Sequence, residues 1–178
     1  MKFTETEIEG CYVLDFFHIQ DDRGSFVKPM HRGELEAQGL DGQFDESFYS
    51  VNSKGVVRGM HFQLPPQDHS KIVYCTSGRL LDVILDLRKS SPSYGKTVSV
   101  ELSGDNFKGV YLPKGCAHGF AVLEDQTCMI YLTSTVHSPE HDSGVLWNSF
   151  GFEWPIEEPI QSERDLSFKA LAEFESPF

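Results

Sequence analysis

Residues 71–87, KIVYCTSGRLLDVILDL, decide the fold class of this chain. Two runs of apolar and β-branched residues, 71–77 and 80–87, lie on either side of a Thr-Ser-Gly turn signal. Short runs of this kind that end at turn residues are typical of β-strands, because helices need longer segments with a period near 3.6. The stretch therefore predicts two consecutive strands.

The same pattern continues in both directions from this stretch. Gly, Pro, Asn, Asp and Ser clusters separate further runs at 10–19, 46–53, 56–63, 96–102, 109–113, 118–124 and 128–135. This spacing predicts an all-β sandwich or barrel. Short peripheral helices are expected at 31–39 and at 162–174. Ser162 is expected to cap the second helix, and its apolar stripe contains Leu166, Ala170, Leu171 and Phe174.

Composition narrows the possible classes of protein. The chain has 178 residues, without a linker or repeat, and we expect one domain over 1–178. A net charge of -12 argues against nucleic acid or an anionic membrane as partner. The start is polar, no apolar run is long enough to span a bilayer, and the four cysteines form no paired motif, so we expect a cytoplasmic protein without an export signal.

Three side chains have the chemistry for proton transfer next to a carbonyl group. Strand alternation places His61 and Gln63 on one face of 56–63, Lys71 on the face of Val73, and Tyr131 on the face of Met129. If these faces share a cavity, a base, a cation for a developing enolate and an acid come together. Each residue taken singly is more often structural than catalytic.

A metal site is the competing interpretation of the same region. His61 and His118 lie in two motifs like those of small β-sandwiches that bind a metal through three His and one Glu. Gln63 replaces one His, however, and only Asp68 is available as the acid. Metal ligands are normally His, Cys or carboxylate, so we expect no metal and no other cofactor.

These motifs together resemble the dTDP-4-dehydrorhamnose 3,5-epimerase family, which has the cupin jelly-roll fold. The resemblance covers nearly the whole chain and rests on DDRGSF, GVVRGMHFQLPP, SKIVYCTSGRLLDVILDLRKSSPSYGK, LPKGCAHGF, MIYLTS, the WN of GVLWNSF, and EWP followed by SERD. It implies a cofactor-independent epimerase of a nucleotide-linked 4-keto-6-deoxyhexose, in deoxysugar biosynthesis.

The resemblance also implies roles for individual residues. It identifies His61 as the base, Asp165 as its partner, Tyr131 as the acid on the opposite face and Lys71 as the group that stabilises the enolate. The substrate-binding residues that it implies are Arg23, Phe26, Arg58, Gln63, His118 and His137. Of these, Arg23 and Arg58 are expected to bind the diphosphate, and His118 is expected to be a further contact in the substrate pocket. Phe26 is expected to reach the site of a second subunit, so a homodimer with an exchanged N-terminal segment is implied.

Four positions depart from the commonest family pattern. Lys28, Glu46 and Phe48 replace residues on the nucleotide side, where Glu, Gln and Asn are usual, and His137 replaces a Tyr near the sugar. The nucleotide base and the choice of carbon 3, carbon 5 or both are therefore open. A ketoisomerase with the same fold, or a cupin that binds a sugar nucleotide without catalysis, are the alternatives.

Overall fold

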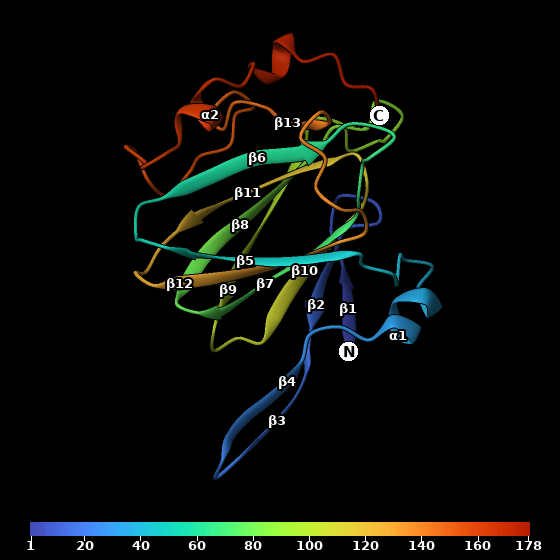
Figure 1. Cartoon of the computed structure of the whole chain (residues 1–178), viewed down its shortest axis with the longest axis vertical. Helices are drawn as coiled ribbons and strands as arrows, with labels where there is room; N and C mark the ends of the chain where they lie inside the picture. Colours follow the sequence, from blue (N-terminus) through green and yellow to red (C-terminus); the bar gives the residue numbers. More distant parts are fainter.

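Two antiparallel sheets packed face to face form most of the molecule, which the computed structural model describes over residues 1–178 (Figure 1). The six-stranded sheet has the order β1-β2-β10-β7-β12-β5, and the five-stranded sheet has the order β13-β6-β11-β8-β9. Strands of the first sheet are β1 (Lys2–Glu5), β2 (Tyr12–Asp15), β5 (Glu46–Asn52), β7 (Lys71–Ser77), β10 (Lys108–Leu112) and β12 (Thr127–Thr133). Strands of the second are β6 (Val57–Gln63), β8 (Arg79–Asp86), β9 (Thr97–Ser103), β11 (Cys116–Val122) and β13 (Asp142–Gly144). The predicted jelly-roll β-sandwich is confirmed.

The stretch 71–87 connects the two sheets. Its first strand, β7, lies in the six-stranded sheet, and its second, β8, lies in the five-stranded sheet. Gly78 makes the turn with φ +73°, and a side chain on it would collide with Thr127. Glycine is required there because it adopts positive φ without steric cost.

Alternation along the strands places the core between the sheets. Along β12, Thr127, Met129, Tyr131 and Thr133 are buried, and the residues between them are half-buried. The main apolar cluster takes side chains from both sheets, among them Val73, Ile84, Val110, Phe120 and Met129. Inward-facing polar side chains share this interior at one end of the sandwich, where they line a cavity.

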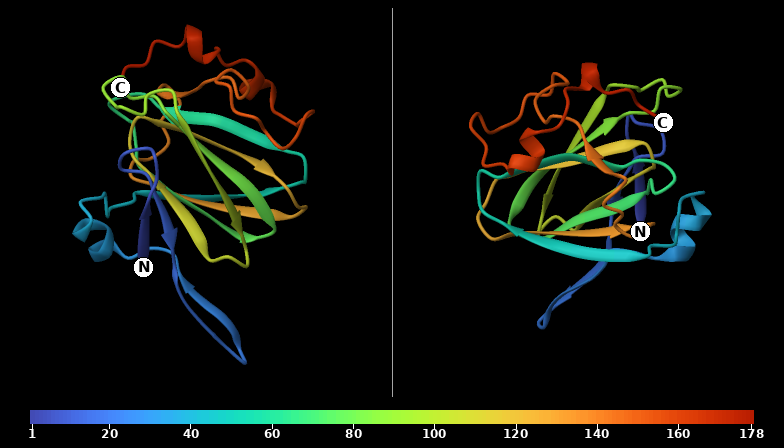
Figure 2. Two further views of the ribbon diagram at one scale, coloured as in Figure 1. Left: turned by 180° about the vertical axis from the view of Figure 1, so that it is seen from behind. Right: turned by 45° about the horizontal axis from the view of Figure 1, so that its top comes forward.

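A two-stranded hairpin projects from the sandwich. The predicted strand at 10–19 is divided into β2 and β3 (Phe17–Asp21), and β4 (Gly24–Lys28) pairs only with β3. Figures 1 and 2 show this blue hairpin extending away from both sheets in every view. Phe17, Ile19 and Phe26 on it are about half exposed. Its two strands pair only with each other. At its base, Val27 packs against the cluster around Phe16, and the His18 ring lies 4.5 Å from that of Phe107.

Helix is minor, as predicted, but the second predicted helix is too long. α1 (Arg32–Ala37) lies inside the predicted 31–39, whereas 162–174 forms only α2 (Glu163–Leu166) and a 3₁₀ turn, Leu171–Glu173. Ser162 does cap α2, with Oγ accepting from the backbone N–H of Asp165 at 3.1 Å. The predicted apolar stripe is wrong for Leu166, which is 56% exposed.

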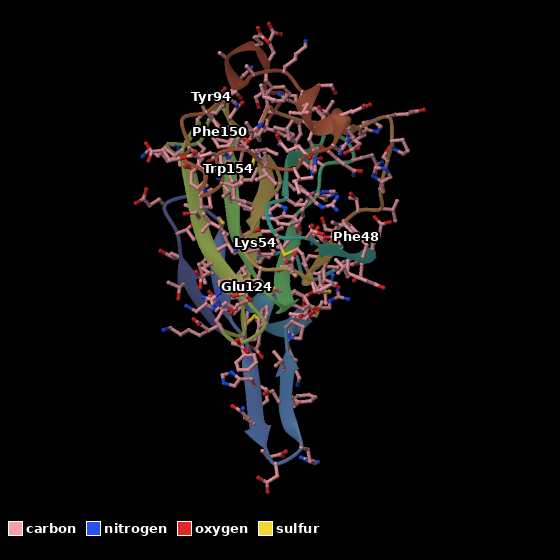
Figure 3. All side chains as sticks on the ribbon, turned by 90° about the vertical axis from the view of Figure 1, so that its left-hand side faces the viewer. Phe48, Lys54, Tyr94, Glu124, Phe150 and Trp154 are labelled. Atoms are coloured by element: carbon pink, nitrogen blue, oxygen red, sulfur yellow. The ribbon has the colours of Figure 1, made fainter.

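The C-terminal segment crosses the outer face of the five-stranded sheet, above β6 in Figure 1. Leu171, Phe174 and Phe178 pack against the buried cluster around Met60 and Phe62. Figure 3 shows Phe150 and Trp154 in this upper region, far from the hairpin. These apolar contacts with the sheet outweigh the tendency of the segment to form a periodic helix, so the segment follows the sheet. None of the helices is long and apolar enough to cross a membrane.

Candidate active site

A cavity of about 330 Å³ opens between the two sheets. His61, Lys71 and Tyr131 all line it, as the strand alternation required. His61 comes from β6 in the five-stranded sheet, while Lys71 and Tyr131 come from β7 and β12 in the six-stranded sheet. The imidazole and the phenol therefore reach the cavity from opposite walls.

His61 and Asp165 form a hydrogen-bonded pair. His61 Nε2 lies 2.9 Å from Asp165 Oδ1, and the backbone N–H of Gly59 donates to Asp165 Oδ2 at 3.0 Å. Because an ionised carboxylate only accepts, Nε2 carries the proton and Nδ1 keeps the lone pair that a base needs. Asp165 is buried, and α2 holds it in place through the Ser162 cap.

The charges of this pair are set by opposing effects. Burial lowers the pKa of His61 and outweighs the hydrogen bond and charge of Asp165, which raise it. For Asp165, burial alone would raise the pKa, but the hydrogen bonds from His61 and Gly59 lower it overall. The resting pair is thus a neutral imidazole beside a carboxylate.

Lys71 brings an ammonium group to the same cavity. It is only 7% exposed, and its Nζ donates to the backbone oxygen of His61 at 3.4 Å. Burial lowers the pKa of Lys71 to about 8, while the charges of Asp142 and Asp82 oppose that change. The amine is therefore charged near neutral pH and able to stabilise a developing oxyanion.

Tyr131 is the buried acid opposite His61. Its Oη lies 3.4 Å from Ser50 Oγ, and its ring stacks on Phe48 with centroids 4.5 Å apart and an interplanar angle of 15°. Burial raises the pKa of Tyr131, although Ser50 and Arg58 oppose the shift. The phenol is therefore protonated at rest and has a proton to give.

His118 forms a second pair with a carboxylate. Its Nε2 lies 2.6 Å from Asp82 Oδ1, and both side chains are buried. Strand register places His118 of β11 opposite His61 of β6, and its ring lies 6.0 Å from that of Tyr131. His61 and His118 are thus each oriented by their own Asp, and His69 and His137 also line the cavity.

The two arginines predicted to contact diphosphate lie in different places. Arg58 lines the cavity, and the buried Asn52 holds its Nε at 2.8 Å. Arg23 lies at the tip of the β3–β4 hairpin, paired with Asp21, and Phe26 lies on the same hairpin. Neither Arg23 nor Phe26 lines the cavity within one chain.

Gln63 and His137 line the cavity near residues 134–141, the loop that connects β12 and β13. The amide of Gln63 is engaged with backbone groups, because Oε1 accepts from Ser138 N and Nε2 donates to Gln67 O, both at 2.7 Å. Glu46 accepts from the backbone N–H of His137 at 2.9 Å. Gln63 and Glu46 therefore hold the loop that presents His137.

The remaining two departures lie in different places, one at the cavity and one on the hairpin. Phe48, labelled in Figure 3, lies on the edge strand β5 and stacks on Tyr131. Lys28 lies on the hairpin, with Nζ 5.9 Å from the ring centre of Phe17. Only Phe48 and Glu46 of the three nucleotide-side departures line the cavity.

Sequence reasoning missed six polar residues of the site. These are Ser50, His69, Asp82, Thr133, Asp142 and Arg164. Asp82 was detectable as an acid inside the apolar run LLDVILDL, since a buried carboxylate needs a partner. Arg164 directly precedes Asp165, but no local pattern shows that its side chain turns toward the cavity.

The four residues of the competing metal site, His61, Gln63, Asp68 and His118, do not all line one cavity. No group of three or more His, Cys, Asp or Glu side chains is close enough to hold a metal ion. Asp68 does not line the cavity, and Gln63 is occupied by the backbone groups of the loop. The two histidines are each committed to an aspartate instead.

Comparison with known proteins identifies the family. The family model described as dTDP-4-dehydrorhamnose 3,5-epimerase matches residues 5–173. The Shigella flexneri enzyme of that name is 37% identical over 170 residues, covering 94% of each chain. The chain belongs to the dTDP-4-dehydrorhamnose 3,5-epimerase family, and the predicted isomerase class is confirmed.

Solved structures agree with this assignment. The Legionella pneumophila epimerase in complex with dTDP-4-keto-L-rhamnose has a TM-score of 0.93 and 30% identity, covering 98% of this chain and 94% of that one. The Bacillus anthracis enzyme with TDP and pyrophosphate bound has a TM-score of 0.92 and 36% identity, covering 96% and 99%. The two proteins bind nucleotide ligands in the same fold.

Proposed function

We propose that this chain inverts carbon 3, carbon 5 or both of a dTDP-linked 4-keto-6-deoxyhexose, in deoxysugar biosynthesis. One observation carries the proposal: a His61–Asp165 base and a Tyr131 acid line one cavity from opposite sheets. Inversion of a carbon centre needs proton removal from one face and proton delivery to the other. The ligands of the Legionella and Bacillus relatives support the substrate class.

Each side chain has a defined step in this reaction. His61 Nδ1 removes the proton from a carbon beside the keto group, and the electron pair moves onto the keto oxygen. The Lys71 ammonium stabilises that oxyanion, which is worth a few kcal/mol in a buried site. Tyr131 Oη then delivers its proton to the opposite face, and the enolate collapses to the ketone.

The diphosphate and base are recognised by other groups. Arg58 offers a guanidinium fork held by Asn52, which suits phosphate oxygens. The exposed face of Phe48 offers an aromatic surface beside Tyr131 for the sugar or the base. His118, oriented by Asp82, is placed to contact the sugar from β11.

An isotope experiment tests the reaction directly. Purified protein is incubated with dTDP-4-keto-6-deoxyglucose in deuterated water, and the sugar is followed by proton NMR. Loss of the signals at carbon 3 or carbon 5 is expected in deuterated water, and the product formed in ordinary water should show new proton coupling constants at the inverted centre. Retention of both protons, or a carbonyl that moves to carbon 3 without inversion, contradicts the proposal and the latter identifies a ketoisomerase.

His137 favours single-centre inversion as the second candidate. Its loop lies at the cavity, and Glu46 and Gln63 hold its neighbours at fixed positions. An imidazole is smaller than the phenol that is usual at this position, so it leaves more room beside the sugar. The sugar is then held less firmly in the orientation that presents its second carbon to the base. Deuterium at one carbon only, in the experiment above, supports this candidate.

We further infer a homodimer in which each β3–β4 hairpin enters the partner. Arg23 and Phe26 have no partner in the cavity of their own chain, and the hairpin exposes Phe17, Ile19 and Phe26. The edge strand β5 also exposes apolar side chains, Tyr49 and Val51. Two exposed apolar surfaces on a small protein are typical of a subunit interface.

We also infer that residues 1–178 act as one domain in a reducing, cytoplasmic setting. The two sheets share a continuous apolar cluster, which supports a single folding unit. The four cysteines, Cys11, Cys75, Cys116 and Cys128, are all free, as expected of a protein that meets no oxidising compartment.

A further inference from the structure

Arg164 is a charged side chain at the cavity to which the proposed mechanism gives no role. It directly precedes Asp165, and its side chain is 45% exposed. Its Nη2 donates to Asp142 Oδ2 at 2.5 Å, and its guanidinium carbon lies 5.0 Å from the ring centre of Phe168. A carboxylate and an aromatic ring thus hold this long side chain in one position.

The other end of the guanidinium reaches the catalytic pair. Arg164 Nη1 lies 3.6 Å from Asp165 Oδ1 and 3.2 Å from His61 Nε2. Since Nε2 donates its proton to the same Oδ1, the two N–H groups converge on one carboxylate oxygen and do not bond to each other. The guanidinium and the imidazole therefore compete for the charge of Asp165.

Phe168 contacts both the guanidinium of Arg164 and the imidazole of His61. Its ring stands edge-on to the His61 ring, with centroids 5.8 Å apart, while its face meets Arg164. A shift of the guanidinium would therefore disturb the packing of the imidazole as well as its charge. The position of the His61 base thus depends on Arg164, which takes no part in the proposed proton transfers.

We propose that Arg164 is a positioning residue for the base: anchored by Asp142 and Phe168, it shares the Asp165 carboxylate with His61 and keeps the imidazole uncharged and ready to accept a proton. This inference rests on the proposed role of His61. It goes further, because it adds a charged neighbour to burial as a reason why a base paired with an aspartate stays unprotonated in the resting enzyme.

The other charged or titratable groups around His61 fit this role. Arg58 lies on the same strand, Lys71 faces it from β7, His118 from β11 and Asp142 from β13. Lys71 adds a second positive charge, while Asp142 is bonded to Arg164 and His118 to Asp82. Burial lowers the pKa of His61 most, and Arg164 and Lys71 lower it further.

Three variants separate charge from packing. Arg164→Gln removes the charge, Arg164→Met removes it but keeps an apolar stem against Phe168, and Arg164→Lys keeps it. The imidazole of His61 is titrated by NMR in substrate-free protein. We expect its pKa to rise by about one unit in the Gln and Met variants, as for loss of one nearby like charge, and to stay close to the parent value in the Lys variant.

Activity provides the second readout. The ascending limb of kcat/KM against pH should move to higher pH by the same amount in the Gln and Met variants, and Lys should restore it. An unchanged His61 titration in both uncharged variants overturns the proposal. A raised KM with that unchanged titration would assign Arg164 to substrate binding instead. Because the titration needs no substrate, this failure is distinguishable from failure of the proposed epimerase.

Discussion

At the scale of single residues, the proposed mechanism divides one reaction between His61 and Tyr131, on two faces of a carbon. We expect His61→Ala to lower kcat by about 10²–10⁴-fold and to stop deuterium uptake into the substrate, because the variant lacks the proposed base. Exchange and product formation are measured together by NMR. His31→Ala is the matched control, since His31 caps α1 outside the cavity and should leave both rates unchanged.

Tyr131→Phe separates proton removal from proton delivery. The variant keeps the ring that stacks on Phe48 but loses the hydroxyl near Ser50. Recovered substrate should therefore still gain deuterium through His61, while inverted product falls steeply. Inversion at the parental rate in this variant would show that another group delivers the proton.

The pKa of Lys71 sets the pH at which we expect activity to fall on the alkaline side. Because burial lowers its pKa to about 8, the ammonium that stabilises the enolate is lost as pH rises through that value. The rate should fall above about pH 8 in the parent protein, and Lys71→Arg should remove this fall, since a guanidinium stays charged. Lys54→Met, at an exposed position, is the control and should leave the profile unchanged.

At the scale of elements, β6 and β11 approach unusually closely at Gly59 and Gly119. A Cβ on Gly59 would lie 2.5 Å from Gly119 Cα, and Gly59 has φ +131°. The register of β11 shifts between His118 and Phe120, where a β-bulge accommodates this contact. The close approach sets His118 opposite His61 and leaves Gly59 N–H free for Asp165.

Gly59→Ala should therefore lower the free energy of unfolding by about 3 kcal/mol or more, because backbone strain and overpacking add. Gly39→Ala is the control: Gly39 also has positive φ, +74°, but nothing lies within 4 Å of its added Cβ. This control should cost only about 1–2 kcal/mol. Denaturant unfolding of both variants provides the comparison, and equal losses would contradict the proposed close contact.

At the scale of the whole molecule, the hairpin proposal makes each site a product of two chains. His61→Ala and Arg23→Ala subunits should each be poorly active alone. Mixed dimers, made by co-expression, should regain up to about a quarter of parental activity, because half the dimers are mixed and one of their two sites carries neither change. Failure to complement, with dimers present, would place Arg23 outside the partner site.

The sequence alone determined the strands, the sandwich and the family, and it supplied the proposed reacting groups. Period-two alternation and turn residues are local signals, so His61, Lys71 and Tyr131 could be assigned to inward faces without a structure. The motif set extended this to Asp165, which lies 104 positions from His61 along the chain. Local signals failed at 162–174, where contact with the sheet replaced most of a periodic helix.

Only the tertiary structure decided which groups meet and what charge they carry. The pairing of His118 with Asp82, the turning of Gln63 toward backbone groups and the approach of Arg164 to His61 all depend on segments distant in sequence. Burial is likewise a property of the packed sheets, and it lowers the pKa of His61 although the paired Asp165 raises it. Proton affinity follows from solvent exclusion and neighbouring charge, which a linear sequence does not contain.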